Sequence, residues 1–91
     1  MIIACIGPRI CYKRFVSDKI HYSHKQIGEK TQVKVIRGVF TINDITYFPI
    51  SDSHHSHGMR FNDYVLLHNA HQLRDFPYIL ELIKHNISKN S

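Results

Sequence analysis

A chain of 91 residues is long enough for one domain with one hydrophobic core, and too short for a second domain. Its composition, 43% hydrophobic and 21% charged, is ordinary for a globular protein and excludes a largely disordered polypeptide. The formal net charge is +5, and residues 1–37 contain eight of the twelve Lys and Arg residues but only Asp18 and Glu29 as acidic residues. This segregated positive charge predicts an anionic partner.

Residues 2–6 form a short apolar run that ends at Gly7-Pro8, a pattern that predicts a buried strand followed by a turn. Residues 10–27 contain neither Gly nor Pro, and their apolar side chains recur on one helical face. These side chains are Phe15, Val16, Ile20 and Ile27. We therefore expect a helix over residues 10–27, ended by Gly28.

Residues 31–36 alternate apolar and polar side chains, as in a strand with one solvated face, and Gly38 interrupts the pattern. Residues 40–50 are rich in β-favouring side chains, with Asn43-Asp44 as a tight turn between two short strands. Residues 51–58 contain no apolar residue, which predicts an exposed loop.

Residues 64–67 predict the last strand, and the chain closes with a helix that Asp75 caps and whose first turn tolerates Pro77. The apolar stripe of that helix contains Phe76, Ile79, Leu80, Ile83 and Ile87. The whole chain, residues 1–91, is thus predicted to be a single α/β domain with the order β-α-β-β-β-α. We expect a small two-layer mixed sheet of four to five strands with two helices, in which residues 1–36 form a right-handed βαβ crossover.

Two helices are too few to cover both faces of such a sheet completely, so we expect an exposed face or one buried in a homodimer. No apolar run approaches the roughly 20 residues of a membrane span, and the first six residues lack the basic leader of a signal peptide. We expect an intracellular protein without a membrane partner. Cys5 and Cys11 are then expected to be free thiols.

Three histidines of the predicted loop, His54, His55 and His57, are candidate metal ligands. No Cys-x-x-Cys or His-Glu-x-x-His pattern accompanies them, so we expect neither a metal nor another cofactor. As an alternative, His57 or His68 would act as a general base while Arg60 holds an anionic intermediate. That arrangement would make the protein a small histidine-dependent nuclease or phosphotransfer enzyme.

Basic residues alternate with aromatic ones along the first predicted helix. We expect Arg9, Lys13, Arg14 and Lys19 to contact phosphates or an acidic protein surface, and Tyr12 to stack on a base. Phe15 is assigned to the core instead. No ribonucleoprotein sheet signature, Gly-x-x-Gly loop or zinc knuckle is present, so the nucleic-acid signal is electrostatic alone.

Residues 3–9, followed by Lys13, resemble the first strand and phosphate loop of helicase- and terminase-type P-loop NTPases. Residues 63–73 resemble the second acidic motif of that family, a hydrophobic strand that ends in Asp-Glu-Ala-His. Arg14 stands where the family has Ser or Thr after the lysine, and the family's carboxylates map to His68 and Asn69. The resemblance therefore implies a shortened, degenerate relative that acts as a nucleotide-binding regulator and does not hydrolyse ATP.

The small size, the segregated positive charge and the lack of a catalytic motif together favour a non-catalytic binding protein. Its compact chain, rich in Lys, Asn and Ile, resembles small virus- or phage-encoded accessory proteins, including inhibitors of host nucleic-acid-processing or defence systems. That resemblance implies action in the cytoplasm of a host cell, on nucleic acid or on an acidic surface of a host protein.

Overall fold

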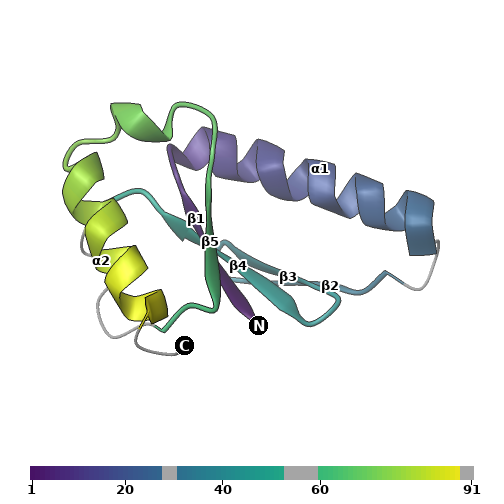
Figure 1. Cartoon of the computed structure of the whole chain (residues 1–91). Helices are drawn as coiled ribbons and strands as arrows, with labels where there is room; N and C mark the ends of the chain where they lie inside the picture. Colours follow the sequence, from purple (N-terminus) through teal and green to yellow (C-terminus); the bar gives the residue numbers. More distant parts are fainter. Residues whose placement is uncertain (28–30, 53–59, 89–91) are drawn as a thin grey trace.

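The structure is a computed structural model that describes residues 1–27, 31–52 and 60–88. One five-stranded sheet, in the order β2-β3-β4-β1-β5, carries two helices (Figure 1). The elements in chain order are β1 (Ile2–Ile6), α1 (Arg9–Ile27), β2 (Val33–Ile36), β3 (Val39–Ile42), β4 (Ile45–Ile50), β5 (Asp63–Leu66), the short 3-10 helix η3 (Ala70–Gln72) and α2 (Phe76–Ser88). The predicted α/β class with a mixed sheet and two helices is confirmed.

Strand β1 lies inside the sheet, parallel to β4 on one side and to β5 on the other. Strands β2, β3 and β4 form an antiparallel meander. It follows that β2 runs parallel to β1, but β3 and β4 lie between them. The predicted crossover over residues 1–36 therefore connects parallel strands that are not neighbours.

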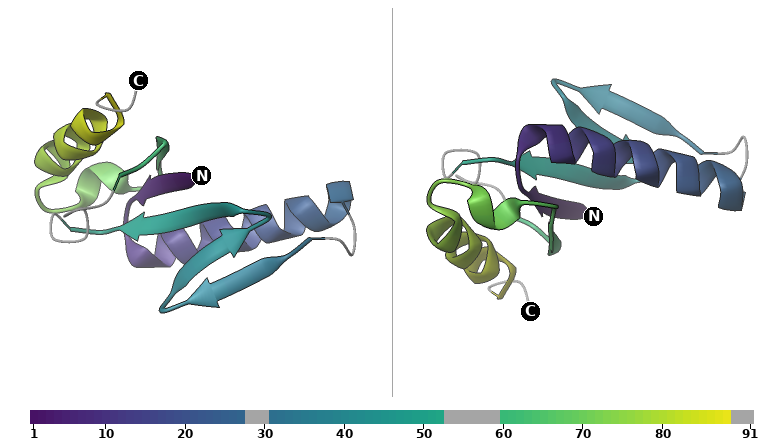
Figure 2. Two further views of the ribbon diagram at one scale, coloured as in Figure 1. Left: turned by 90° about the horizontal axis from the view of Figure 1, so that it is seen from below. Right: turned by 90° about the horizontal axis from the view of Figure 1, so that it is seen from above.

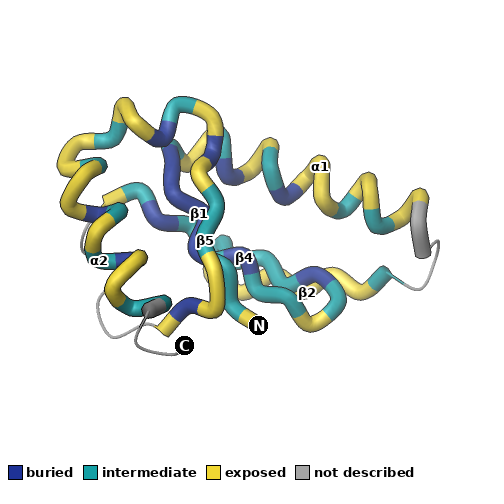
Figure 3. Tube along the Cα trace, viewed as in Figure 1, coloured by how far each residue is buried: buried dark blue, intermediate teal, exposed yellow. Residues whose placement is uncertain are grey.

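The two helices cover opposite faces of the sheet. Ala4 and Ile6 pack in one buried cluster with Ile79 of α2, whereas Cys5 packs in a second cluster with Val16 of α1. Alternate side chains of a strand point to opposite faces, so each helix lies over its own face of β1. Buried residues concentrate where both helices cover the sheet (Figure 3). Over β3 the arrangement has the two predicted layers, sheet and α1.

The predicted stripe of α2 is confirmed. Ile79 and Ile83 are fully buried, and Phe76, Leu80 and Ile87 pack against the same cluster. The helix begins directly after Asp75, whose carbonyl oxygen accepts a hydrogen bond from the Ile79 N–H at 2.9 Å.

Two-residue turns connect β2 to β3 and β3 to β4. Asn43 and Asp44 have φ angles of 49° and 71°, and Arg37 and Gly38 have φ angles of 52° and 79°. Two successive residues with positive φ are typical of the type I′ turn, whose twist matches that of an antiparallel hairpin. The predicted turn at Asn43-Asp44 is confirmed. The interruption at Gly38 is a second turn of the same kind.

The Tyr12 hydroxyl connects α1 to the meander. It donates a hydrogen bond to the carbonyl oxygen of Tyr47 in β4 and accepts one from the N–H of Phe40 in β3 at 3.0 Å. Tyr12 is only 2% exposed. The expectation that it stacks on a base is therefore wrong, because its ring is buried in the core and its hydroxyl is hydrogen-bonded to β3 and β4.

The hydroxyl occupies a defined position in the ladder between β3 and β4. Hydrogen-bonded and non-bonded pairs alternate along antiparallel strands, and the pair that flanks a two-residue turn is hydrogen-bonded. Here that pair is Ile42 and Ile45, so Phe40 and Tyr47, two positions further along, form the next hydrogen-bonded pair. Tyr12 thus places a side-chain hydroxyl between two backbone groups that a regular ladder would join directly.

Replacing Tyr12 with Phe should lower the free energy of unfolding by about 1–3 kcal/mol, because it leaves the Phe40 N–H and the Tyr47 carbonyl without their partner. Urea unfolding measures the change. Tyr22→Phe, at a tyrosine of the same helix that is 62% exposed, is the control and should change stability by less than about 0.5 kcal/mol. Equal stability of the two variants would show that the hydroxyl contributes nothing.

Burial also makes stability depend on alkaline pH. It raises the pKa of the Cys5 thiol from 9.0 to about 12, and it raises the pKa values of Tyr12 and Tyr47. The unfolded chain therefore loses these protons first. The contribution of the protonated Cys5 thiol to the free energy of unfolding is fully present below pH 9. It declines as the pH rises toward 12, by up to about 1.4 kcal/mol per pH unit for one group.

Urea unfolding between pH 8 and about 11 tests this linkage. Cys5→Ala should flatten the decline, because the variant lacks one of the groups whose proton is released on unfolding. An unchanged slope in Cys5→Ala would contradict the assignment to Cys5, whatever the stability of the variant at neutral pH.

Candidate nucleic-acid interface

Helix α1 is rich in positive charge. Five of its 19 residues are Lys or Arg, and Asp18 is its single acidic residue. The helix begins immediately after Gly7-Pro8, and the Pro8 carbonyl oxygen accepts hydrogen bonds from the N–H groups of Cys11 and Tyr12 at 3.0 and 3.1 Å. Tyr12 and Val16 are buried against the sheet. Their positions determine, through the helical spacing, the directions in which the remaining side chains of α1 point.

The structure distributes the predicted contact residues around α1. Arg14 is exposed on the outer side. Lys19 lies beside the Phe15 ring, with its Nζ 5.5 Å from the ring centroid. Phe15 itself is part of the core, as predicted, and packs edge-on against the Tyr47 ring at 5.7 Å.

Arg9 and Lys13 face the β2–β3 hairpin. A Cβ atom placed on Gly38 would lie 2.8 Å from Nη2 of Arg9, so the guanidinium group rests on the turn. Lys13 lines a groove of about 430 Å³ between α1 and Phe40 of β3. The other residues that line this groove are Val16, Ser17, Ile20, His21 and His24.

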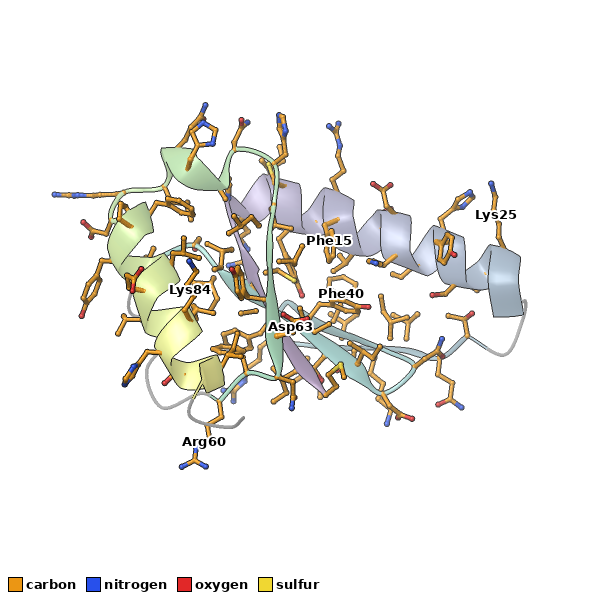
Figure 4. All side chains as sticks on the ribbon, in the orientation of Figure 1. Phe15, Lys25, Phe40, Arg60, Asp63 and Lys84 are labelled. Atoms are coloured by element: carbon orange, nitrogen blue, oxygen red, sulfur yellow. The ribbon has the colours of Figure 1, made fainter. Side chains whose placement is uncertain are left out.

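The outer face of α1 includes three exposed basic residues, Arg14, His21 and Lys25, together with the exposed acidic residue Asp18, four positions after Arg14. Steps of seven and four residues place these side chains on one side of an α-helix. Lys25 points away from the sheet in Figure 4, whereas Phe15 points toward it. Within the described part of the chain, Arg14 and Lys25 form no ion pair. Their charges are therefore hydrated and available to an external anion.

Sequence reasoning missed His21 and Lys25 as members of this face. Their spacing from Arg14 indicates that the three residues share one helical face. The sequence alone does not show that this face is the exposed one, because basic residues occur all around α1 and the buried side must be known first.

A second groove, of about 380 Å³, lies between α1 and the end of β5. It brings Cys11, Arg14 and Asp18 of α1 close to His68, which is exposed. Arg60 precedes β5 and His68 follows it, and a four-residue strand spans roughly 13 Å. The structure therefore separates Arg60 from His68, and these two side chains do not converge on one catalytic site.

The loop histidines His54, His55 and His57 lie outside the described residues. Among the residues that are described, no group of three or more His, Cys, Asp or Glu side chains is placed to hold a metal ion. Cys5 and Cys11 are free thiols.

The Gly7-Pro8 turn is too short to surround a phosphate. The Gly7 N–H donates to the Ile50 carbonyl oxygen at 3.0 Å, and Pro8 has no N–H. A phosphate loop requires several free backbone N–H groups and a lysine directed at the phosphates. Lys13 lies instead in the groove beside Phe40. The geometry of this turn therefore differs from what the P-loop resemblance implies.

Comparison of the chain with protein-family models, with curated proteins and with solved structures finds no match in any of the three. No helix among the described residues has the length and apolarity to span a membrane.

The glycine at position 7 is required for packing. A Cβ atom there would lie 2.6 Å from the Cβ of Leu67, a buried residue that follows β5. We expect Gly7→Ala to destabilise the protein by about 1–3 kcal/mol, because the two segments would have to move apart. Thermal unfolding tests this against Ser17→Ala, a change at an exposed position of α1 that should alter stability by less than about 0.5 kcal/mol. A Gly7→Ala variant as stable as the control would disprove the packing role.

Proposed function

We propose that this protein is a non-catalytic binding module that holds nucleic acid through the outer face of α1. The observation that carries the proposal is the set of exposed basic residues on this face, Arg14, His21 and Lys25, with the cations of Arg14 and Lys25 unpaired among the described residues. Arg9 and Lys13 add positive charge on the side of the helix next to the hairpin.

Unpaired surface cations favour a polyanion for a physical reason. Each Lys or Arg that meets a phosphate releases a condensed counterion, and the gain in counterion entropy drives binding. Arg14 and Lys25 are eleven residues apart in the sequence, which is about 16 Å along an α-helix. That length matches roughly five base-pair steps of 3.4 Å. The face is therefore long enough to contact several phosphates at once.

The compositional resemblance to small virus- or phage-encoded accessory proteins supports a setting in the cytoplasm of a host cell. There the protein would act by occupying nucleic acid that host processing or defence proteins also bind. On this proposal no cofactor takes part, and binding depends on charge and position alone.

Fluorescence anisotropy with labelled single- and double-stranded DNA and RNA, at about 50 and 200 mM salt, tests the proposal. We expect binding that weakens steeply with salt. The double variant Arg14→Glu/Lys25→Glu should lose at least about tenfold in affinity, and its salt slope should be shallower by about two phosphate contacts.

The matched control is Arg74→Glu/Lys84→Glu, which makes the same change in net charge at two exposed positions in and before α2. It should retain most of the affinity, because its charges lie away from α1. Equal losses in the two double variants would contradict the assignment of binding to α1. No binding by the unmodified protein at the lower salt would overturn the proposal and favour an acidic protein partner.

A further inference from the structure

Strand β2 ends the sheet and is exposed along its whole length. All four of its residues are solvent-exposed, including Val33, Val35 and Ile36 at 38%, 54% and 69%. No described strand pairs with its outer edge. Figure 2 shows the β2–β3 hairpin projecting from the side of the sheet away from α2. An apolar strand with a free edge readily pairs with another chain.

The register of the hairpin identifies the backbone groups on this edge. Ile36 and Val39 flank the two-residue turn, so they form a hydrogen-bonded pair, and Lys34 and Thr41 form the next one. The Asn43 N–H bonds the Gln32 carbonyl oxygen at 3.0 Å, which continues the same alternation. The N–H and C=O groups of Val33 and Val35 therefore point outward, away from β3.

The side chains of the same two valines lie on one face. Val35 is paired with Phe40 and Val33 with Ile42, whose side chains belong to the core under α1. Alternation places Lys34 on the opposite face, between the two outward-directed residues. An incoming strand would thus meet two apolar side chains on one face, and Lys34 with the exposed Ile36 on the other.

We propose that the free edge of β2 binds an extended segment of a partner protein in which apolar and acidic residues alternate. The segment pairs with the outward backbone groups of Val33 and Val35 and adds a sixth strand to the sheet. Its apolar side chains cover the two valines, and an acidic side chain stands opposite Lys34. This surface is distinct from the outer face of α1 and goes beyond the proposed nucleic-acid binding.

Charge selects an acidic segment and disfavours a second copy of the chain. Two copies of β2 that paired Val33 with Val35 in antiparallel fashion would place Lys34 directly opposite Lys34, and like charges in that position destabilise a sheet. Arg9 and Arg37 add positive charge at the turn end of the hairpin. Asp44, which with Lys34 lines a small pocket at the other end, is the acidic exception.

The probe is a fluorescein-labelled eight-residue peptide of alternating valine and glutamate, measured by anisotropy against a valine–lysine peptide of the same length. We expect the glutamate peptide to bind at least about tenfold more tightly. Val35→Pro should weaken the binding of the glutamate peptide by at least about tenfold, because proline removes an outward N–H without breaking the hydrogen bonds between β2 and β3. Val35→Thr retains the N–H and should bind within about threefold of the unmodified protein.

Lys34→Glu is an independent test that leaves the backbone intact. It should reverse the preference, so that the valine–lysine peptide binds more tightly than the glutamate peptide. Unchanged peptide binding by Val35→Pro, or an unchanged preference in Lys34→Glu, would overturn the proposal. So would sedimentation that shows a dimer of the unmodified protein dissociated by Val35→Pro, since the occupant would then be a second copy. Oligonucleotide binding by Val35→Pro should be unchanged, which separates this surface from α1.

Discussion

The Tyr12 hydroxyl bond to β3 and β4 is the constraint on which the arrangement of the two proposed surfaces depends. A single side chain from α1 satisfies the Phe40 N–H and the Tyr47 carbonyl oxygen, so the helix is fixed to the sheet at a hydrogen-bonded position of the meander. These backbone groups lie in the core, where loss of their partner is costly. Together with the packing of Phe15 and Val16 in the same core cluster, these bonds set the position of α1 on the sheet and its rotation about its own axis.

That rotation determines which charges are available. With Tyr12 and Val16 buried, Arg14 and Lys25 must point to solvent, and Lys13 must face the groove beside Phe40. The same geometry leaves β2 beyond the reach of α1, so its valines and its outward backbone groups are exposed. An exposed basic helix face and a free strand edge are thus two consequences of one packing arrangement.

Most of the fold follows from local patterns in the sequence, and the site does not. The apolar stripe of α2 and the Asn43-Asp44 turn are predicted correctly because helical spacing and turn chemistry act within a few residues. Tyr12 is misassigned because a tyrosine between cations has the same pattern whether it stacks on a base or donates a buried hydrogen bond. The exposure of β2 and the parallel neighbours of β1 depend on strand order, which no local pattern contains. The packing of Gly7 on Leu67 is likewise a long-range contact that no local pattern contains.

The central claim is that the outer face of α1 is the surface that meets nucleic acid. The most direct measurement is a titration of ¹⁵N-labelled protein with a short single-stranded oligonucleotide, in which the backbone amide chemical shifts are monitored. Binding through α1 predicts chemical-shift changes centred on Arg14, His21 and Lys25, with the shifts of Val33 and Val35 unchanged. Shifts confined to β2 or to α2, with α1 unaffected, would contradict it.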